Sequence, residues 1–99
     1  MSLVFHVAQA SDVDQASQSG TYRCESIETE GFIHCCKPEQ LQGVLERYYS
    51  GVKGLLLLHI DTDLLQPDLV MENTVGSEEL FPHVYGPINM DAVIQIASV

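Results

Sequence analysis

The run Leu55-Leu56-Leu57-Leu58-His59-Ile60 constrains this chain most, because any strand that it forms is apolar on both faces. Strands covered on both faces lie inside a sheet, so we expect residues 55–60 to form a central strand. The run has strand length and falls far short of the ~20 apolar residues of a membrane-spanning helix. We therefore expect a globular domain and no association with a membrane.

Apolar segments elsewhere in the chain indicate further short strands. They are expected at residues 3–7, 32–36, 69–72 and 92–97. Residues 20–30 are polar and are expected to be irregular, and residues 74–79 are expected to form a polar loop.

Two segments have the pattern of a helix. The first is expected to run from Ser11, whose hydroxyl can cap it, to Gln18, with Gly20 ending it. The second begins at Pro38, and its apolar stripe consists of Leu41, Val44, Leu45 and Tyr48. The pattern predicts one α+β domain over residues 1–99, with mostly antiparallel short strands and about two main helices.

The chain is strongly acidic, with 14 acidic residues, 4 basic residues and a formal net charge of −10. Such a surface repels phosphate backbones, so general nucleic-acid binding is not expected. A small phosphorylated ligand remains compatible with the sequence, because one or two basic residues and backbone amides can bind it. The sequence does not determine the oligomeric state.

Three cysteines, two of them adjacent, argue against a disulfide framework and for a reducing compartment. The N-terminal segment MSLVFHVAQ lacks the basic region and the long apolar stretch of a signal peptide. We therefore expect a cytoplasmic protein.

The trio His34-Cys35-Cys36 concentrates reactive side chains in one predicted strand. Strand alternation places His34 and Cys36 on one face and Cys35 on the other, so the two thiols cannot clasp one metal ion. His34 and Cys36 would lie about 7 Å apart along the strand, against the ~3 Å that a nucleophile and its base require. We expect no metal site, and we expect both cysteines to be packing residues. His34 is either a core imidazole bonded to backbone or a pocket-facing ring that binds ligand or moves a proton.

The segment Phe81-Pro82-His83-Val84-Tyr85-Gly86-Pro87-Ile88-Asn89 is expected to be a loop stiffened by its prolines. It either packs on the core as a turn or presents His83, Tyr85 and Asn89 to a ligand. Glu30 precedes the His34 strand and is either a solvated carboxylate or the partner of an imidazole. We expect His6, His34, His83 and Tyr85 to converge on one concave site.

The stretches Glu30-Gly31-Phe32-Ile33-His34-Cys35 and Phe81–Asn89 together resemble the two signatures of a small bacterial family, domain of unknown function 952. The resemblance covers nearly the whole chain. It implies a fold similar to that of ADP-ribosyltransferases and of RNA 2′-phosphotransferases that use NAD. It makes NAD a candidate cofactor, although the family itself has no settled activity. An enzyme of this descent would transfer a glycosyl or phosphoryl group.

The resemblance also suggests roles for individual residues. His34, His83 and Glu30 are candidate catalytic residues, with Glu30 as acid or base. Candidate residues for holding the nucleotide are His6, Tyr85, Asn89 and Arg23.

The sequence departs from these relatives in two respects. Cys36 stands where the family usually has serine, and the chain has two arginines, whereas the phosphotransferases hold phosphates with several. Two alternatives therefore remain beside an enzyme: a binding module for a small ligand or protein that kept the fold without the chemistry, and a purely structural role for the histidines. Glu72 and Glu30 are the candidates for a catalytic glutamate.

Overall fold

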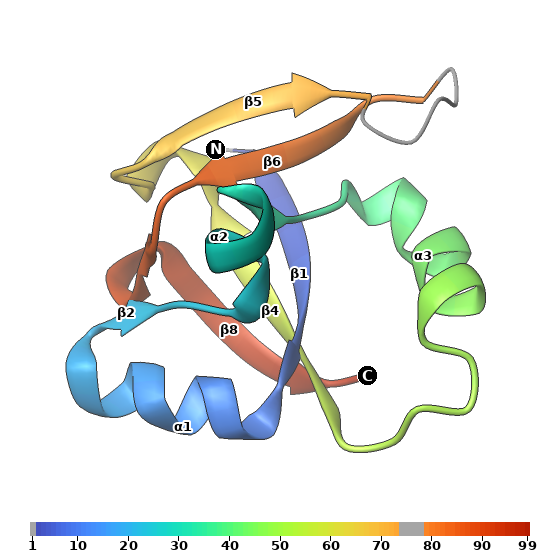
Figure 1. Ribbon diagram of the computed structural model, residues 1–99, viewed down its shortest axis with the longest axis horizontal. Helices are drawn as coiled ribbons and strands as arrows, with labels where there is room; N and C mark the ends of the chain where they lie inside the picture. Colours follow the sequence, from blue (N-terminus) through green and yellow to red (C-terminus); the bar gives the residue numbers. More distant parts are fainter. Residues whose placement is uncertain (1, 74–78) are drawn as a thin grey trace.

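The apolar run lies at the centre of a three-stranded antiparallel sheet (Figure 1). The computed structural model describes residues 2–73 and 79–99. In it, β4 (Leu55–Asp61) lies between β1 (Leu3–Gln9) and β8 (Val93–Ser98). The prediction of a central strand at residues 55–60 is confirmed, as are those of the first and last strands.

The two faces of this sheet border two separate apolar clusters. Because β1 alternates, Val4 and Ala8 enter one cluster with Leu58, while Phe5 and Val7 enter the other. The first cluster also takes residues of α1 (Ala10–Ser19), and the second is covered by α3 (Leu41–Tyr48). Figure 1 shows α1 and α3 on different sides of the molecule.

The helices follow the sequence pattern, with two corrections. Gly20 ends α1 in the left-handed conformation, at φ 88°, and its N–H donates to the carbonyl of Ala16 at 2.8 Å. Ser11 does not cap α1, because the helix begins one residue earlier at Ala10 and makes no side-chain cap bond. The second helix starts as a 3₁₀ turn, η1 (Pro38–Gln40), that leads into α3.

The segment 20–30 was expected to be irregular, and this expectation is wrong. It contains β2 (Thr21–Tyr22) and α2 (Glu25–Glu30). Two glutamates lie in the first turn of α2, where the helix dipole favours them, and Gly31 ends the helix at φ 87°. Six residues are too few to show a helical period in the sequence, so the pattern gave no signal.

A second three-stranded antiparallel sheet has the order β3–β6–β5. Its strands are β3 (Ile33–His34), β5 (Asp68–Glu72) and β6 (Phe81–Tyr85). The stiff loop expected from residue 81 is therefore wrong over β6, which is the central strand of this sheet. The carbonyl of Pro82 accepts from the N–H of Cys35 at 3.0 Å, so proline lies where β3 is ending and no long ladder needs its missing donor.

The predicted strand at residues 32–36 is divided between the two sheets. Ile33 and His34 pair with β6, whereas Cys36 forms an isolated bridge with Phe5 of β1, with N–H to carbonyl distances of 2.8 Å in both directions. The chain thus passes from one sheet to the other within three residues. This crossing brings His34 next to β1 and α3.

The remaining elements complete an α+β arrangement with antiparallel sheets, as predicted. A two-stranded antiparallel sheet pairs β2 with β7 (Ile88–Asn89). Two short 3₁₀ turns are also present, η2 (Thr62–Leu64) and η3 (Met90–Ala92). Of the polar loop expected at residues 74–79, all but residue 79 lies outside the described residues. Within the described ranges, no helix is both long and apolar enough to cross a membrane.

Candidate functional site

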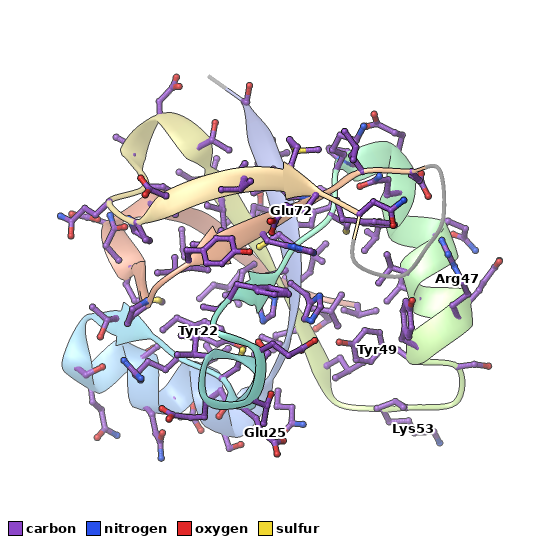
Figure 2. All side chains as sticks on the ribbon, turned by 45° about the horizontal axis from the view of Figure 1, so that its top comes forward. Tyr22, Glu25, Arg47, Tyr49, Lys53 and Glu72 are labelled. Atoms are coloured by element: carbon purple, nitrogen blue, oxygen red, sulfur yellow. The ribbon has the colours of Figure 1, made fainter. Side chains whose placement is uncertain are left out.

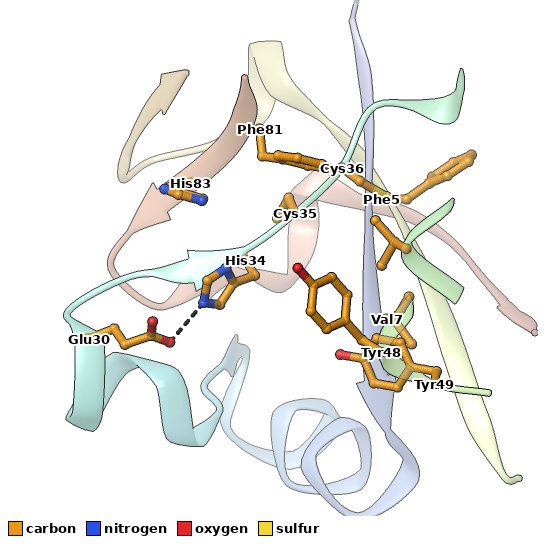
Figure 3. Close-up of a pocket in the computed structure, with 11 residues that line it drawn as sticks. Phe5, Val7, Glu30, His34, Cys35, Cys36, Tyr48, Tyr49, Phe81 and His83 are labelled. Atoms are coloured by element: carbon orange, nitrogen blue, oxygen red, sulfur yellow. Dashed lines mark hydrogen bonds and ion pairs between the residues drawn. The ribbon is translucent and has the colours of Figure 1, made fainter. Parts of the chain in front are cut away.

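A cavity of about 420 Å³ opens where β1, α3 and the end of β3 meet (Figure 3). Its polar side consists of Glu30, His34 and His83. The other lining residues are mostly apolar or aromatic: Phe5, Val7, Cys35, Cys36, Val44, Tyr48, Tyr49 and Phe81. Figure 3 shows the two tyrosines on the opposite side of the cavity from Glu30 and His83. This combination of size, apolar walls and a few convergent polar groups is typical of small-molecule sites.

The end of α2 positions Glu30 against His34. Because Gly31 turns the chain back at φ 87°, the last residue of the helix faces the strand that follows it. The Nε2 atom of His34 donates to Oε2 of Glu30 at 2.7 Å, and each side chain is 48% exposed. Glu30 therefore fixes one nitrogen of an accessible imidazole, which matches the expectation that it partners this ring.

His83 lies on the central strand β6, and its imidazole is held through Nδ1, whereas that of His34 is held through Nε2. Its Nδ1 atom donates to Oε1 of Glu72 at 2.9 Å, and the hydroxyl of Tyr85 donates to the same oxygen. The Tyr85 hydroxyl and then the His83 bond lower the pKa of the Glu72 carboxyl, so this residue is an ionised acceptor. Nδ1 of His83 must consequently carry the proton.

The second nitrogen of His83 is left available to a ligand. In the neutral ring Nε2 has a lone pair, and among the described residues it makes no hydrogen bond. The ring of Phe32 stacks on this imidazole with centroids 4.2 Å apart and planes inclined by 15°. Stacking and the Glu72 bond together fix both the ring plane and the tautomer.

His6 lies on the opposite face of β1 from the cavity. Its Nδ1 atom donates to the backbone carbonyl of His34, and Nε2 accepts from the hydroxyl of Tyr22 at 2.8 Å. The pKa of His6 is lowered to about 4, mainly by burial; the backbone bond to His34 opposes this effect, and the nearby His34 side chain adds to it. His6 is thus a neutral internal bridge. It supports His34 from behind and does not line the cavity.

The other predicted ligand-holding residues also lie away from the cavity lining. Tyr85 is 41% exposed and bonds to Glu72. Asn89 is buried, and its amide donates to the carbonyl of Leu64 at 2.9 Å, which ties two turns together. Arg23 pairs with Glu28 at 3.1 Å on the surface. Of the four side chains expected to converge, two line the cavity: His34 and His83.

The adjacent cysteines differ from their predicted arrangement. Strand alternation was expected to send Cys35 and Cys36 to opposite faces, but both line the cavity, because regular pairing with β6 ends at His34. Both are buried, as expected of packing residues, and burial raises the pKa of both thiols, that of Cys36 to about 11. No cluster of three metal-ligating side chains occurs among residues 2–73 and 79–99.

Sequence reasoning missed the aromatic wall. Tyr48 was placed on the apolar stripe of the second helix, but it is 59% exposed and borders the cavity with Tyr49. Phe5 and Val7 were not among the predicted site residues, although His6 between them was. The available signal was the alternation of β1, which puts these two residues on one face and His6 on the other.

The sequence of this chain matches a known protein family over most of its length. It belongs to the proteins of unknown function grouped as DUF952, whose family model matches residues 7–96. This match confirms the family that the sequence was expected to belong to.

Two solved structures of one bacterial protein are similar to the structure of this chain. The crystal structure of protein CC0527 from Caulobacter crescentus is 28% identical, with a TM-score of 0.86 over 97% of this chain and 84% of that chain. The solution NMR structure of CC0527 is 28% identical, with a TM-score of 0.84 over 100% of this chain and 85% of that chain. Among curated proteins, none matches this chain.

Proposed function

We propose that this chain binds a small molecule with an aromatic ring in the cavity between β1, α3 and β3, and that NAD is the first ligand to test. The observation that carries the proposal is the cavity itself: about 420 Å³, with aromatic walls and a polar side formed by Glu30, His34 and His83. Pockets of this size and composition enclose ligands of one or two rings. NAD enters as a candidate from the resemblance to ADP-ribosyltransferases.

Charge determines which part of NAD the cavity would take. The four basic residues all lie in the described part of the chain, and none of them lines the cavity. Phosphates would therefore be unfavourable inside and would extend into solvent. The nicotinamide ring is aromatic and positively charged, so it suits walls of tyrosine and phenylalanine beside a carboxylate.

The experiment compares three nucleotides by thermal unfolding: NAD, ADP-ribose and AMP. NAD at 100 times its dissociation constant should add about 2.7 kcal/mol to the free energy of unfolding. ADP-ribose and AMP lack the nicotinamide ring and should add much less. If millimolar NAD leaves the melting temperature unchanged, the proposal is wrong.

A second candidate function, glycosyl transfer from NAD to water, is favoured by the Glu30–His34 pair. The bond between C1′ of the ribose and the nicotinamide nitrogen would break, and its electron pair would leave with nicotinamide. Water would attack C1′ while the free nitrogen of His34 took the proton of that water. Chromatography would detect nicotinamide and ADP-ribose. Binding of NAD without any product would assign the chain to the non-catalytic alternative, a binding module.

A further inference from the structure

We propose that the cavity selects a planar organic cation whose positive group carries N–H donors, as an amidinium or a guanidinium does. This inference rests on the proposed function only in assuming that a small ligand enters the cavity. It goes further by assigning the charge and the hydrogen-bonding character of that ligand from the groups that face it.

On the side of the cavity formed by Glu30 and His83, the polar groups can accept hydrogen bonds. In the neutral ring, Nε2 of His83 has a lone pair, because Nδ1 carries the single ring proton and donates it to Glu72. Glu30 binds His34 through Oε2, and among the described residues its second carboxylate oxygen makes no hydrogen bond. A ligand that meets these two acceptors must supply donors, because a ligand acceptor placed there would face their lone pairs without forming a hydrogen bond.

The carboxylates on and directly behind the polar side of the cavity are negatively charged. Glu30 lies on the lining itself, and Glu72 lies directly behind His83, 2.9 Å from its Nδ1 atom. A basic side chain, Arg47 of α3 (Figure 2), also lies by the aromatic wall: its guanidinium is 6.0 Å from the ring centroid of Tyr48 and 3.9 Å from the Glu79 carboxylate. That ion pair offsets the charge of Arg47, so the Glu30 carboxylate makes the electrostatic potential inside the cavity negative.

The walls add a third reason for a cation. Aromatic side chains enter the lining from β1, from the end of α3 and from β6: Phe5, Tyr48, Tyr49 and Phe81. Ring faces attract a positive group, and several rings around one cavity recognise organic cations in other proteins. Aromatic walls and a carboxylate together favour a cation over a neutral ring of the same shape.

Three probes of nearly the same size test this inference: benzamidine, which is cationic, benzamide, which is neutral, and benzoate, which is anionic. Affinities are measured by NMR titration of the full chain. We expect benzamidine to bind at least about tenfold more tightly than benzamide, since a charge-assisted hydrogen bond is about twice as strong as a neutral one. Benzoate should bind more weakly than either. Benzoate binding as tightly as benzamidine would overturn the inference.

Substitutions separate the local carboxylate from overall charge. Glu30→Gln keeps an oxygen for His34 and should weaken benzamidine about tenfold while changing benzamide less than about twofold. Glu28→Gln is the matched control, because Glu28 lies on the same helix but pairs with Arg23 outside the cavity. Equal losses in the two variants would overturn the inference. Failure of all three probes in a chain that binds NAD overturns the inference alone, whereas failure of NAD as well overturns the proposed function.

Discussion

His34 and His83 face each other across β3 and β6, and their imidazole rings meet edge to face with centroids 5.2 Å apart. Each ring bonds through one nitrogen to a glutamate, His34 to Glu30 and His83 to Glu72. Two imidazoles oriented by carboxylates therefore border one cavity. The pairing of two short strands brings together two sequence signatures that lie far apart in the chain.

The Tyr85 hydroxyl should control the ionisation of Glu72. It is the main cause of the lowered pKa of this carboxyl, ahead of the bond from His83. In Tyr85→Phe we expect the pKa of Glu72 to rise towards its usual value, which ¹³C NMR titration of the side-chain carboxyls measures. Because the pKa of Glu72 is lower in the folded chain than in the unfolded chain, the carboxyl stabilises the fold at pH values above its unfolded pKa. This stability is lost as the pH falls, so the variant should lose less stability on acidification. An unchanged Glu72 titration would contradict this account.

Acid should destabilise the fold through His6. The pKa of His6 is about 4 in the folded chain against 6.5 for the unperturbed group, so the unfolded chain takes up the proton first as the pH falls. The stability due to neutral His6 is complete above pH 6.5 and is lost between pH 6.5 and pH 4, by about 3 kcal/mol.

The measurement is urea unfolding of the wild type and of His6→Asn across this pH range. Asparagine keeps a donor for the His34 carbonyl but has no proton to gain. The variant should therefore lose about 3 kcal/mol less than the wild type between the two pH values. Parallel pH dependences in the two proteins would show that His6 is not a buried neutral group.

The adjacent thiols should react slowly although they line a cavity. Burial raises the pKa of both, so little thiolate is present at neutral pH. Cys24 is only partly buried and should be alkylated first by iodoacetamide. Mass spectrometry of the labelled peptides measures the order. Modification of Cys35 or Cys36 ahead of Cys24 would be incompatible with this description of the cavity.

A larger side chain inside the cavity should weaken the binding of NAD while the chain still folds. Val44 lines the cavity from α3, so Val44→Phe would place an aromatic ring in the space of the ligand and should lower the affinity for NAD at least about tenfold. Val70→Phe is the matched control, because Val70 is 40% exposed on β5 and does not line the cavity. Isothermal titration calorimetry compares the two. Equal affinities would place the ligand elsewhere.

The central strand, the two outer strands of its sheet and the two main helices could be predicted because the signals for them are local in the sequence. The apolar side chains of residues 55–60 favour a buried strand, and Gly20 can adopt the left-handed conformation that ends α1 because it lacks a side chain. The α2 helix was missed because its six residues contain a single apolar position, Ile27, which packs on the core only in the folded chain. The strand at β6 was missed because two prolines suggested a loop, and only the position of β3 shows that Pro82 needs no donor.

The site was predictable in part for the same reason. His34 and His83 could be chosen because each stands in a distinctive motif. Glu30 could be named as an imidazole partner because it lies close to His34 in the sequence. The pairing of Glu72 with His83 could not be predicted, because Glu72 reaches His83 across two paired strands and the register of that pairing is not visible in the sequence. His6 was placed in the site because of the resemblance to nucleotide-binding relatives, yet strand alternation places it on the other face of β1.

NMR of the imidazole Cε1–H signals during titration with NAD tests the central claim most directly. The chain has four histidines, and the cavity lining includes His34 and His83 but not His6 or His59. The account predicts that the first two signals move with a common saturating curve while the other two stay in place. Four unmoved signals, or movement confined to His6 and His59, would contradict it.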